Sequence, residues 1–454
     1  MKKRMTGILL AGLMAALTGC MPSAEPTQAQ TTAQAENAVK DDDAAQAEGA
    51  AENTETAGEV TIRMNWWGGD SRHEATLNGI EAFEAANPGI HVEPEYEAYS
   101  GHQEKIALAI NSGVAADVLQ MNMNWIFDYS PNGDVFLDLN TVSDVLDLTA
   151  YEQSDLDFYT INGSLQAVPI SKTGRVFFWN KTTFDKIGAE IPSTLDELIA
   201  VGNQFAAYED GTYYPLVILE NEKVYLMMYY LECKYGKPYA ENMELQYTRE
   251  ELIDGFEFMK MLEDNHVLPS SEKMAGDGAD LIDTNQNWID GHYGGIYMWD
   301  SNLQKHQEAL EDGECVIGPM IEMGDYHGGI LKISQCLAVP ATTEHPKEAA
   351  MLIEFLFGSE EGAKLLGDTR GVPCNEKALA ALDLSDSLAA EANQHVMEWG
   401  GYMMDLVFSN NALSADDGAF LLALQSQSYG EMTAEQCADT VIEGTNQAIQ
   451  SLTQ

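Results

Sequence analysis

The sequence predicts an α/β protein that begins with a parallel sheet and is large enough for two lobes. Strand-like and helix-like segments alternate in the order β-α-β-α-β between residues 60 and 121, and this alternation is typical of a parallel sheet covered by helices. About 395 residues follow a low-complexity N-terminal region, which is more than a single hydrophobic core usually holds. In such folds, ligands bind beyond the carboxyl ends of the strands.

The first strand is expected at residues 60–67, VTIRMNWW, because apolar and polar side chains alternate there. Trp66 continues the apolar phase of this strand, so we expect it to be packed in a core. Trp67 has the opposite phase, so we expect it to be exposed and to face a binding cleft. The following segment has apolar residues at helical spacing, and Ser71 with Glu74 matches a capping box, which predicts that a helix begins at the turn.

Three loops are expected to meet at one edge of this sheet. A second strand is predicted at residues 90–99, a helix around Ile106 and Ile110, and a short buried strand at residues 117–121. Aromatic rings pack against the C–H faces of sugars while amides, carboxylates and guanidinium groups bind the hydroxyls, so the residues after these strands predict a carbohydrate site. The candidate ligand-binding residues from these loops are Trp67, Asp70, Ser71, Arg72, Tyr99, Asn122, Asn124 and Trp125.

The first twenty residues predict export and attachment to a membrane. A basic start precedes an apolar run that is too short to span a bilayer. The LTGC at residues 17–20 looks like the lipobox of bacterial lipoproteins, in which the cysteine is lipidated; an ordinary signal peptide with a chance cysteine is the alternative. We therefore expect a lipoprotein signal peptide at residues 1–19 and an extracytoplasmic protein held at the bacterial cell membrane by a lipid on Cys20. Residues 20–58 contain no aromatic residue and are expected to form a disordered tether.

The composition narrows the classes of partner. The chain has 73 acidic and 23 basic side chains, a formal net charge of −50, which repels nucleic acid. The five cysteines after Cys20 show no CxxC or Cys/His metal spacing, so we expect no metal site and no cofactor. We interpret these cysteines as small buried hydrophobic residues, with one or two disulfide bridges left open, and we expect a monomer.

From about Val60 to its C-terminus, the chain resembles the extracellular solute-binding proteins of bacterial ABC importers, in the sugar-binding family 1 that includes maltose-binding protein. The motifs that carry the resemblance are EAFEAANPGIHVE, SGVAADVLQ, VPISKTGRVFFWNKTTFDKIG, IPSTLDELIA and HPKEAAMLIEFLFGSEEGAKLL. Ala116 and Leu195 depart from the family's usual residues at a turn and at the start of a helix. These departures concern details of the fold and not the function.

The resemblance implies a two-lobed periplasmic-binding-protein-like fold of class II, in which crossing segments join the lobes and the lobes close over a ligand. The first lobe would take residues 59–168 and about 329–375, and the second would take residues 169–328 and about 376–454. The crossings would fall near Pro169, near Gly328 and near Gly371. The further ligand-binding residues implied at the crossings and in the second lobe are Thr173, Arg175, Trp299, Asp300 and Arg370.

Three of the six arginines, Arg72, Arg175 and Arg370, fall at these rim or crossing positions. A guanidinium group binds a carboxylate or sulfate with two parallel hydrogen bonds, so the three arginines suggest an acidic sugar. The alternative is that each arginine pairs with one of the many acidic residues of the chain.

The resemblance implies a receptor that captures a mono- or oligosaccharide and delivers it to the permease subunits of an ABC transporter. A ligand-binding partner of a membrane sensor would share the same fold, and the sequence does not separate the two. A secreted glycoside hydrolase is a weaker alternative, because it also surrounds a sugar with aromatic and carboxylate groups. The chain has no GxSxG motif, and HEATL lacks the second histidine of HExxH. We therefore expect a protein that is not an enzyme.

Overall fold

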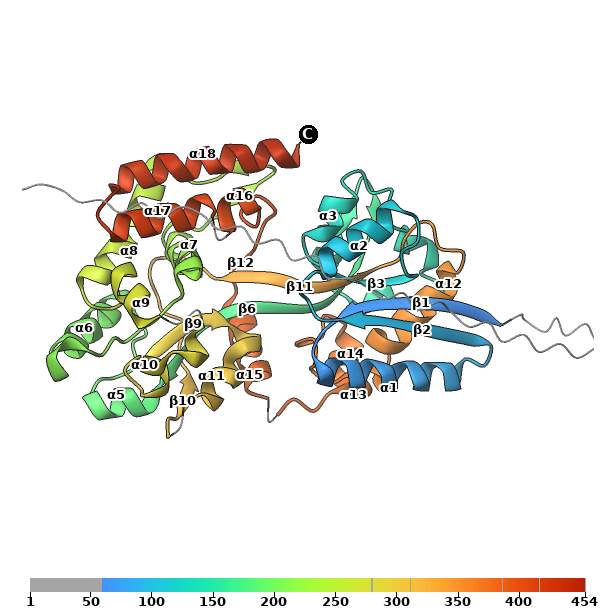
Figure 1. The fold of residues 1–454 in the computed structure, drawn as a ribbon, viewed down its shortest axis with the longest axis horizontal. Coiled ribbons are helices and arrows are strands. Elements are labelled where there is room, and N and C mark those ends of the chain that lie inside the picture. The colour runs from blue at the N-terminus through green and yellow to red at the C-terminus, as the bar shows by residue number, and fades with distance from the viewer. Residues whose placement is uncertain (1–58, 279–280, 311, 386, 416, 454) are drawn as a thin grey trace, which may run out of the picture. The chain divides into compact units, whose positions relative to one another are not determined.

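The computed structural model describes residues 59–278, 281–310, 312–385, 387–415 and 417–453 (Figure 1). The expected signal peptide at residues 1–19, the lipidation site Cys20 and the whole of the expected tether at residues 20–58 lie outside the described residues. Within the described ranges, no helix is both long enough and apolar enough to cross a membrane.

The predicted β-α-β-α-β order at the start of the fold is confirmed. The elements are β1 (Val60–Trp67), α1 (Asp70–Ala86), β2 (Ile90–Glu97), α2 (His102–Asn111) and β3 (Val118–Asn122). Strand β1 pairs in parallel with β2 on one side and with β3 on the other. The carboxyl ends of these three strands therefore lie at the same edge of the sheet, as the sequence predicts.

The predicted capping box at the start of α1 is wrong. The helix begins at Asp70 and its N-cap is Gly69, which has no side chain to accept a hydrogen bond. Ser71 already lies inside the first turn, so its hydroxyl is past the position from which a cap side chain reaches back. The first helical hydrogen bond runs from the His73 N–H to the Gly69 carbonyl, 3.0 Å.

Two long antiparallel strands continue the sheet, β6 (Val168–Asn180) and β11 (Ile330–Ala338). The strand order is β10-β6-β11-β3-β1-β2, and β9 and β12 pair with β6 and β11 respectively. The bounds of these shorter strands are Gly295–Trp299 for β9, Cys315–Ile317 for β10 and Tyr402–Met403 for β12. The pairing of β11 with β6 shifts register between Ile333 and Gln335 and again between Gln335 and Cys336.

The buried side chains form two separate hydrophobic cores. One core contains Ile62, Trp66 and Ile333, and the other contains Val176, Tyr229 and Ile330. Strand β6 contributes Ile170 to the first core and Val176 to the second, while β11 contributes Ile333 to the first and Ile330 to the second. Both strands therefore pass from one lobe to the other (Figure 1). The expected two-lobed α/β fold with crossing segments is confirmed.

The remaining elements around the first core are short helices, one hairpin and the helices that follow β11. They are α3 (Trp125–Tyr129), η1 (Leu139–Val142), η2 (Leu148–Ala150), α4 (Gln153–Phe158), β4 (Thr160–Ile161), β5 (Ser164–Leu165), α12 (Pro346–Ile353), the π-helical turn η7 (Glu354–Gly358), α13 (Glu360–Leu366) and α14 (Glu376–Ala381). Helix α14 packs on α13, and the chain joins the second core only with α15 (Leu388–Trp399), which contributes Ala392 and Val396.

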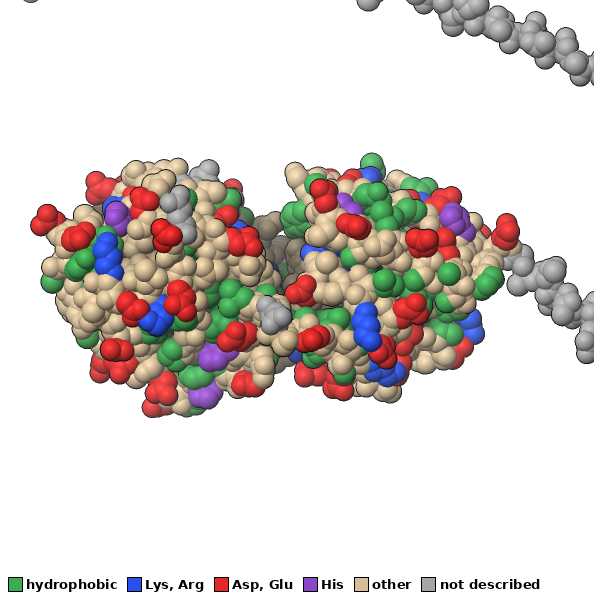
Figure 2. Space-filling model, turned by 90° about the horizontal axis from the view of Figure 1, so that it is seen from below, with side chains coloured by type: hydrophobic (Ala, Val, Ile, Leu, Met, Phe, Trp, Pro, Cys, Tyr) green, Lys and Arg blue, Asp and Glu red, His purple; other side chains and the backbone are tan. Residues whose placement is uncertain are grey.

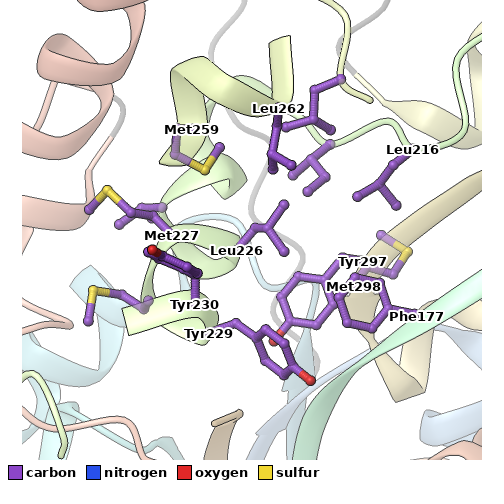
Figure 3. Packing of buried hydrophobic residues seen from close by; sticks show 14 of the residues in the cluster. Phe177, Leu216, Leu226, Met227, Tyr229, Tyr230, Met259, Leu262, Tyr297 and Met298 are labelled. Atoms are coloured by element: carbon purple, nitrogen blue, oxygen red, sulfur yellow. The ribbon is translucent and has the colours of Figure 1, made fainter. Parts of the chain in front are cut away.

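The second core is surrounded mainly by helices. Besides α15, these elements are α5 (Lys181–Ile187), α6 (Leu195–Ala206), η3 (Glu209–Gly211), η4 (Glu220–Glu222), α7 (Lys223–Tyr235), β7 (Ala240–Glu241), β8 (Glu244–Leu245), α8 (Arg249–Asp264), α9 (Ser271–Asp277), η5 (Ile282–Thr284), α10 (Gln286–Ile289), η6 (Asp300–Asn302), α11 (Leu303–Glu308), α16 (Asn411–Ser414), α17 (Ala419–Ser428) and α18 (Ala434–Leu452). Aromatic contacts join the helices to the sheet: Tyr229 of α7 packs edge-on against Tyr297 of β9, which also contacts Phe177 of β6 (Figure 3).

The five cysteines in the described part of the chain are free thiols. Four are buried and Cys374 is half-buried, which agrees with their interpretation as small hydrophobic residues. In the same residues, no group of three or more His, Cys, Asp or Glu side chains is placed to hold a metal ion. Acidic side chains are spread over the face of the molecule shown in Figure 2.

Candidate functional site

An aromatic cluster lies at the carboxyl ends of β1, β2 and β3. The ring of Trp67 lies 5.3 Å from that of Trp125, 5.6 Å from that of Tyr99 and 5.0 Å from that of His102, measured between ring centroids. Tyr99 and Trp125 are stacked, with an interplanar angle of 14°. The structure thus brings together the aromatic residues of all three loops that the sequence predicts to meet.

The expected exposure of Trp67 is wrong. Its strand phase is as predicted, because Trp66 on the opposite face packs against Tyr96 and donates a hydrogen bond from its indole N–H to His73 Nδ1, 3.1 Å. The face that Trp67 occupies is covered by other aromatic rings, however, so only 7% of Trp67 is exposed. The ring of this cluster that reaches solvent is Tyr99, with 53% of its surface exposed.

Polar groups hold Tyr99 and its neighbours in place. Asn122 donates from Nδ2 to the Tyr99 hydroxyl, 3.3 Å, and His102 Nδ1 lies 3.0 Å from Glu97 Oε1. Burial lowers the pKa of His102, and the Glu97 carboxylate opposes this effect in part. Asn124 precedes α3, is half-buried and makes no capping hydrogen bond with its side chain. The result is an exposed tyrosine ring with the Asn122 amide at its hydroxyl, a surface suited to a sugar face and its hydroxyls.

The residues at the start of α1 differ in their exposure to solvent and in their hydrogen bonds. Asp70 and Ser71 are exposed. Arg72 is partly buried, and its guanidinium donates twice to the Thr369 carbonyl, 3.0 and 2.9 Å, and once to the Trp67 carbonyl, 3.2 Å. Arg72 therefore ties the loop after β1 to the loop that contains Arg370.

Arg370 is buried beside Arg72. Its Nε donates to Gln120 Oε1, 2.8 Å, and its Nη2 donates to Thr76 Oγ1, 2.9 Å, while Nη1 has no partner among the described residues. Burial, followed by repulsion from Arg72, lowers the pKa of Arg370. Two neighbouring guanidinium groups are thus held by neutral oxygen atoms.

A second cluster lies where β6 meets β9. Arg175 of β6 is directly opposite Trp299 of β9 in the strand register. Its Nη2 donates to Glu222 Oε2, 3.1 Å, and to the Tyr297 carbonyl, 2.7 Å, while its Nε and Nη1 have no partner in the described chain. The guanidinium carbon lies 4.3 Å from the ring centroid of Tyr225 and 5.1 Å from that of Trp299. Arg175 is fully buried, so it does not reach solvent itself.

Thr173 and Asp300 form a hydrogen bond to each other at the crossing strand β6. Asp300 accepts hydrogen bonds from the Thr173 hydroxyl, from the Gly174 N–H at 3.0 Å and from Asn393 Nδ2 at 2.7 Å. Burial raises the pKa of Asp300, and these donors oppose the rise. Because 2% of Asp300 is exposed, its carboxylate fixes β6 to η6 and α15.

Lys332 of β11 is a residue of this cluster that the sequence did not predict. Its Nζ lies 4.2 Å from the centroid of the Trp299 ring, and Lys332 pairs with Thr173 in the strand register. Burial, followed by repulsion from Arg175, lowers the pKa of Lys332 to about 8. One feature of the sequence could have pointed to Lys332. It is a lysine in the apolar stretch ILKISQCLA, close to the expected crossing near Gly328.

Most cations of this acidic chain are paired with a carboxylate. Among the described lysines and arginines, four have no carboxylate within ion-pairing distance in the described chain: Arg72, Lys186, Lys332 and Arg370. Three of these four lie in the candidate site. The alternative that each arginine of the site pairs with an acidic residue therefore holds for Arg175 and fails for Arg72 and Arg370.

Two large hollows of the surface are lined by other residues. These hollows, of about 820 and 830 Å³, border α14 and α15, and neither is lined by a candidate ligand-binding residue. We place the candidate site by its aromatic and cationic side chains, because recognition of a polar ligand depends on such groups and not on volume alone.

The structure is that of a two-lobed binding protein. Two α/β lobes share long crossing strands, and clusters of aromatic rings and of cationic side chains lie at strand ends. The chain belongs to the family described as bacterial extracellular solute-binding proteins, and the family model matches residues 79–394. The expected family resemblance is thus confirmed. The family is one of binding proteins that act outside the cytoplasm, and a glycoside hydrolase is not the class that it defines.

Solved structures of similar proteins agree with this family. A periplasmic solute-binding protein from Pectobacterium atrosepticum SCRI1043 is 32% identical with a TM-score of 0.78, covering 87% of this chain and 100% of that one. A periplasmic oligogalacturonide-binding protein from Yersinia enterocolitica is 32% identical with a TM-score of 0.77 and the same coverage. The Yersinia protein in complex with saturated digalacturonic acid aligns with 33% identity and a TM-score of 0.73, covering 87% of this chain and 99% of that one.

The match to curated proteins is shorter. A binding protein of Brucella abortus (strain 2308) is 27% identical over 128 residues, which is 26% of this chain and 29% of that protein's length. The aligned region thus spans less than a third of this curated relative.

Proposed function

We propose that the protein is an extracytoplasmic receptor that captures an acidic oligosaccharide between its lobes and delivers it to the permease subunits of an ABC importer. The observation that carries the proposal is the presence of Arg72, Lys332 and Arg370, without carboxylate partners, in a chain with a net charge of −50. A negatively charged ligand supplies the partner that these cations lack. The similar Yersinia protein binds digalacturonic acid, which supports this ligand class.

The proposed ligand surface consists of an aromatic part and a cationic part. Tyr99 provides a ring for a sugar face, and Asn122 lies at its hydroxyl. Asn124 and the exposed Asp70 and Ser71 are available for hydroxyl groups of the sugar. The buried rings of Trp67 and Trp125 pack against each other, and Trp125 stacks on the Tyr99 ring. The cationic part contains Arg72 and Arg370 in one cluster and Lys332 with Trp299 in another. Arg175 is buried against Trp299, and Thr173 and Asp300 fix strand β6.

We assign the lobes and the anchor as part of the same proposal. The first lobe comprises residues 59–168 and about 329–375, and the packing of α14 on α13 favours its extension to about residue 381. The second lobe comprises residues 169–328 and the C-terminal helices. A lipid on Cys20 holds the monomeric receptor at the membrane, with residues 20–58 as a tether.

The test is a binding titration of the purified domain with digalacturonic acid and with a neutral disaccharide. We expect stoichiometric binding of the acidic sugar, its recovery unchanged after denaturation of the protein, and a raised melting temperature. A ligand at about 100 times its Kd adds roughly 2.7 kcal/mol to the stability. Binding of neither sugar, or conversion of the sugar to products, would reject the proposal.

A further inference from the structure

Lys332 carries a positive charge that no described residue neutralises. Its Nζ lies over the Trp299 ring, 4.2 Å from the centroid, and no described residue forms a hydrogen bond or an ion pair with it. The side chain is half-buried. A cation over an aromatic face gains a modest attraction, but this does not replace the water that burial removes.

The surroundings of Lys332 make its charge more costly. Arg175 contacts the same Trp299 ring from 5.1 Å, and its Nε and Nη1 have no acceptor among the described residues. Two carboxylates oppose this repulsion, Glu222 of η4 and Asp300 of η6. Each is already engaged, Glu222 with Arg175 and Asp300 with Thr173, Gly174 and Asn393. The Lys332 ammonium thus has no carboxylate partner of its own in the described chain.

The position of Lys332 places it where a ligand held by both lobes would lie. It is on β11, directly opposite Thr173 of β6, and both strands pass from one core to the other. Lys332 follows Ile330, which belongs to the second core, and precedes Ile333, which belongs to the first. An anion bound at Lys332 would therefore sit at the junction of the two lobes.

We propose, on the basis of the receptor function proposed above, that Lys332 binds a carboxylate of the sugar ligand while Trp299 holds the ammonium in place. Lys332 then determines the preference for uronate over neutral sugars. Binding of the sugar at Lys332 is also coupled to the uptake of a proton. A carboxylate at Lys332 favours the charged ammonium, so the ligand-bound receptor takes up a proton where the free lysine is only partly protonated.

The first test is calorimetric titration of wild type, Lys332→Met and Lys186→Met with digalacturonic acid and with the neutral digalactose of the same linkage. Lys186 is the matched control, because it also lacks a carboxylate partner but lies on α5, where it donates to the Tyr213 hydroxyl. We expect Lys332→Met to weaken binding of the acidic sugar about tenfold or more and to change that of the neutral sugar less than about twofold. Lys186→Met should match wild type for both sugars.

The second test measures proton uptake, which a purely structural lysine would not change. Titration at pH 8 in two buffers of different ionisation enthalpy should show proton uptake on binding for wild type and none for Lys332→Met. Lys332→Arg keeps a charge and should keep the preference for the acidic sugar. This variant tests the proposal even if the methionine variant does not fold.

The outcomes separate the two proposals. If wild type prefers the acidic sugar and a folded Lys332→Met keeps that preference, the role of Lys332 is rejected while the receptor function stands. If wild type binds both sugars equally, selection of the carboxylate by Lys332 is rejected and sugar binding stands. If wild type binds neither sugar, both proposals are rejected.

Discussion

Tyr99 stacks on Trp125 with ring centroids 6.1 Å apart and planes 14° apart, and the Tyr99 ring is the exposed member of the pair. Trp125 is almost fully buried. A sugar placed on the outer face of Tyr99 would thus rest on a ring that is supported from behind.

We expect Tyr99→Ala to weaken sugar binding about tenfold, or 1.4 kcal/mol, with little effect on stability. Removal of an exposed ring costs little packing but takes away the stacking surface. Tyr96→Ala is the control, because Tyr96 is 44% exposed but stacks on Trp66, on the other face of the sheet. Equal loss of affinity in both variants would contradict the assignment of Tyr99 as the stacking residue.

Trp67→Ala should destabilise the fold by roughly 3 to 5 kcal/mol, because it leaves a cavity among Tyr99, His102 and Trp125. Trp66→Ala, on the opposite face of β1, should cost a similar amount. Urea unfolding of both variants measures these changes. A Trp67→Ala protein as stable as wild type would show that the ring is exposed in solution, as the strand phase alone suggests.

Asp300→Ala should destabilise the crossing region. The substitution leaves Thr173, the Gly174 N–H and Asn393 without their shared acceptor, at about 1 to 3 kcal/mol for each buried donor. Asp290→Ala removes an exposed carboxylate and serves as the control, with a change within about 0.5 kcal/mol. If Asp300→Ala kept the stability and lost only sugar affinity, Asp300 would be a ligand-binding residue.

Glu232 should make the stability depend on pH. Burial raises the pKa of this carboxyl far above its ordinary value, and the hydrogen bond from the Gly329 N–H, 2.8 Å, lowers it only in part. In the unfolded chain the same group ionises near pH 4. Its contribution to folding is therefore complete below about pH 4 and is lost as the pH rises toward the folded pKa, by up to about 1.4 kcal/mol per pH unit.

Glu232→Gln keeps an acceptor for Gly329 and does not titrate, so its stability relative to wild type should increase from pH 5 to pH 9. Chemical denaturation of both proteins across this range measures the difference. Parallel curves would show that Glu232 does not bind a proton on folding.

Cys20→Ala should release the protein from the membrane fraction or leave it as an uncleaved precursor, because the lipid supplies the anchor. Fractionation of cells that express wild type or the variant, followed by mass analysis of the N-terminus, tests this. Wild type and variant found equally in the membrane fraction would contradict the proposed lipidation.

Local patterns predicted the first part of the fold well, because the alternation in β1 and the helical spacing in α1 depend on neighbouring residues. The exposure of Trp67 could not be predicted in this way. Its strand phase is correct, but His102 and Trp125, which cover it, come from other loops. The predicted capping box is wrong for a local reason, since the N-cap of the helix is Gly69, two residues before Ser71.

The candidate site was predicted in part for a similar reason. The convergence of the loops after β1, β2 and β3 follows from parallel pairing, and the structure shows it. Lys332 becomes a site residue only because β11 pairs with β6 and brings it to Trp299. Asp300 was predicted through the family resemblance. The hydrogen-bond donors that occupy its carboxylate come from β6 and α15, which are distant in the sequence, so they could not be predicted from nearby residues.

The two register shifts in β11, on either side of Gln335, interrupt the regular ladder between the crossing strands. A β-bulge leaves backbone groups unpaired and bends its strand, and this segment lies inside the first core, between Ile333 and Cys336, close to the junction at Lys332. A change in backbone twist there would redirect β11 where it leaves the first core toward the second lobe. The amide protons around Gln335 should therefore exchange with solvent faster than those of the regular ladder at Lys332 and Thr173, and a bound sugar should slow that exchange.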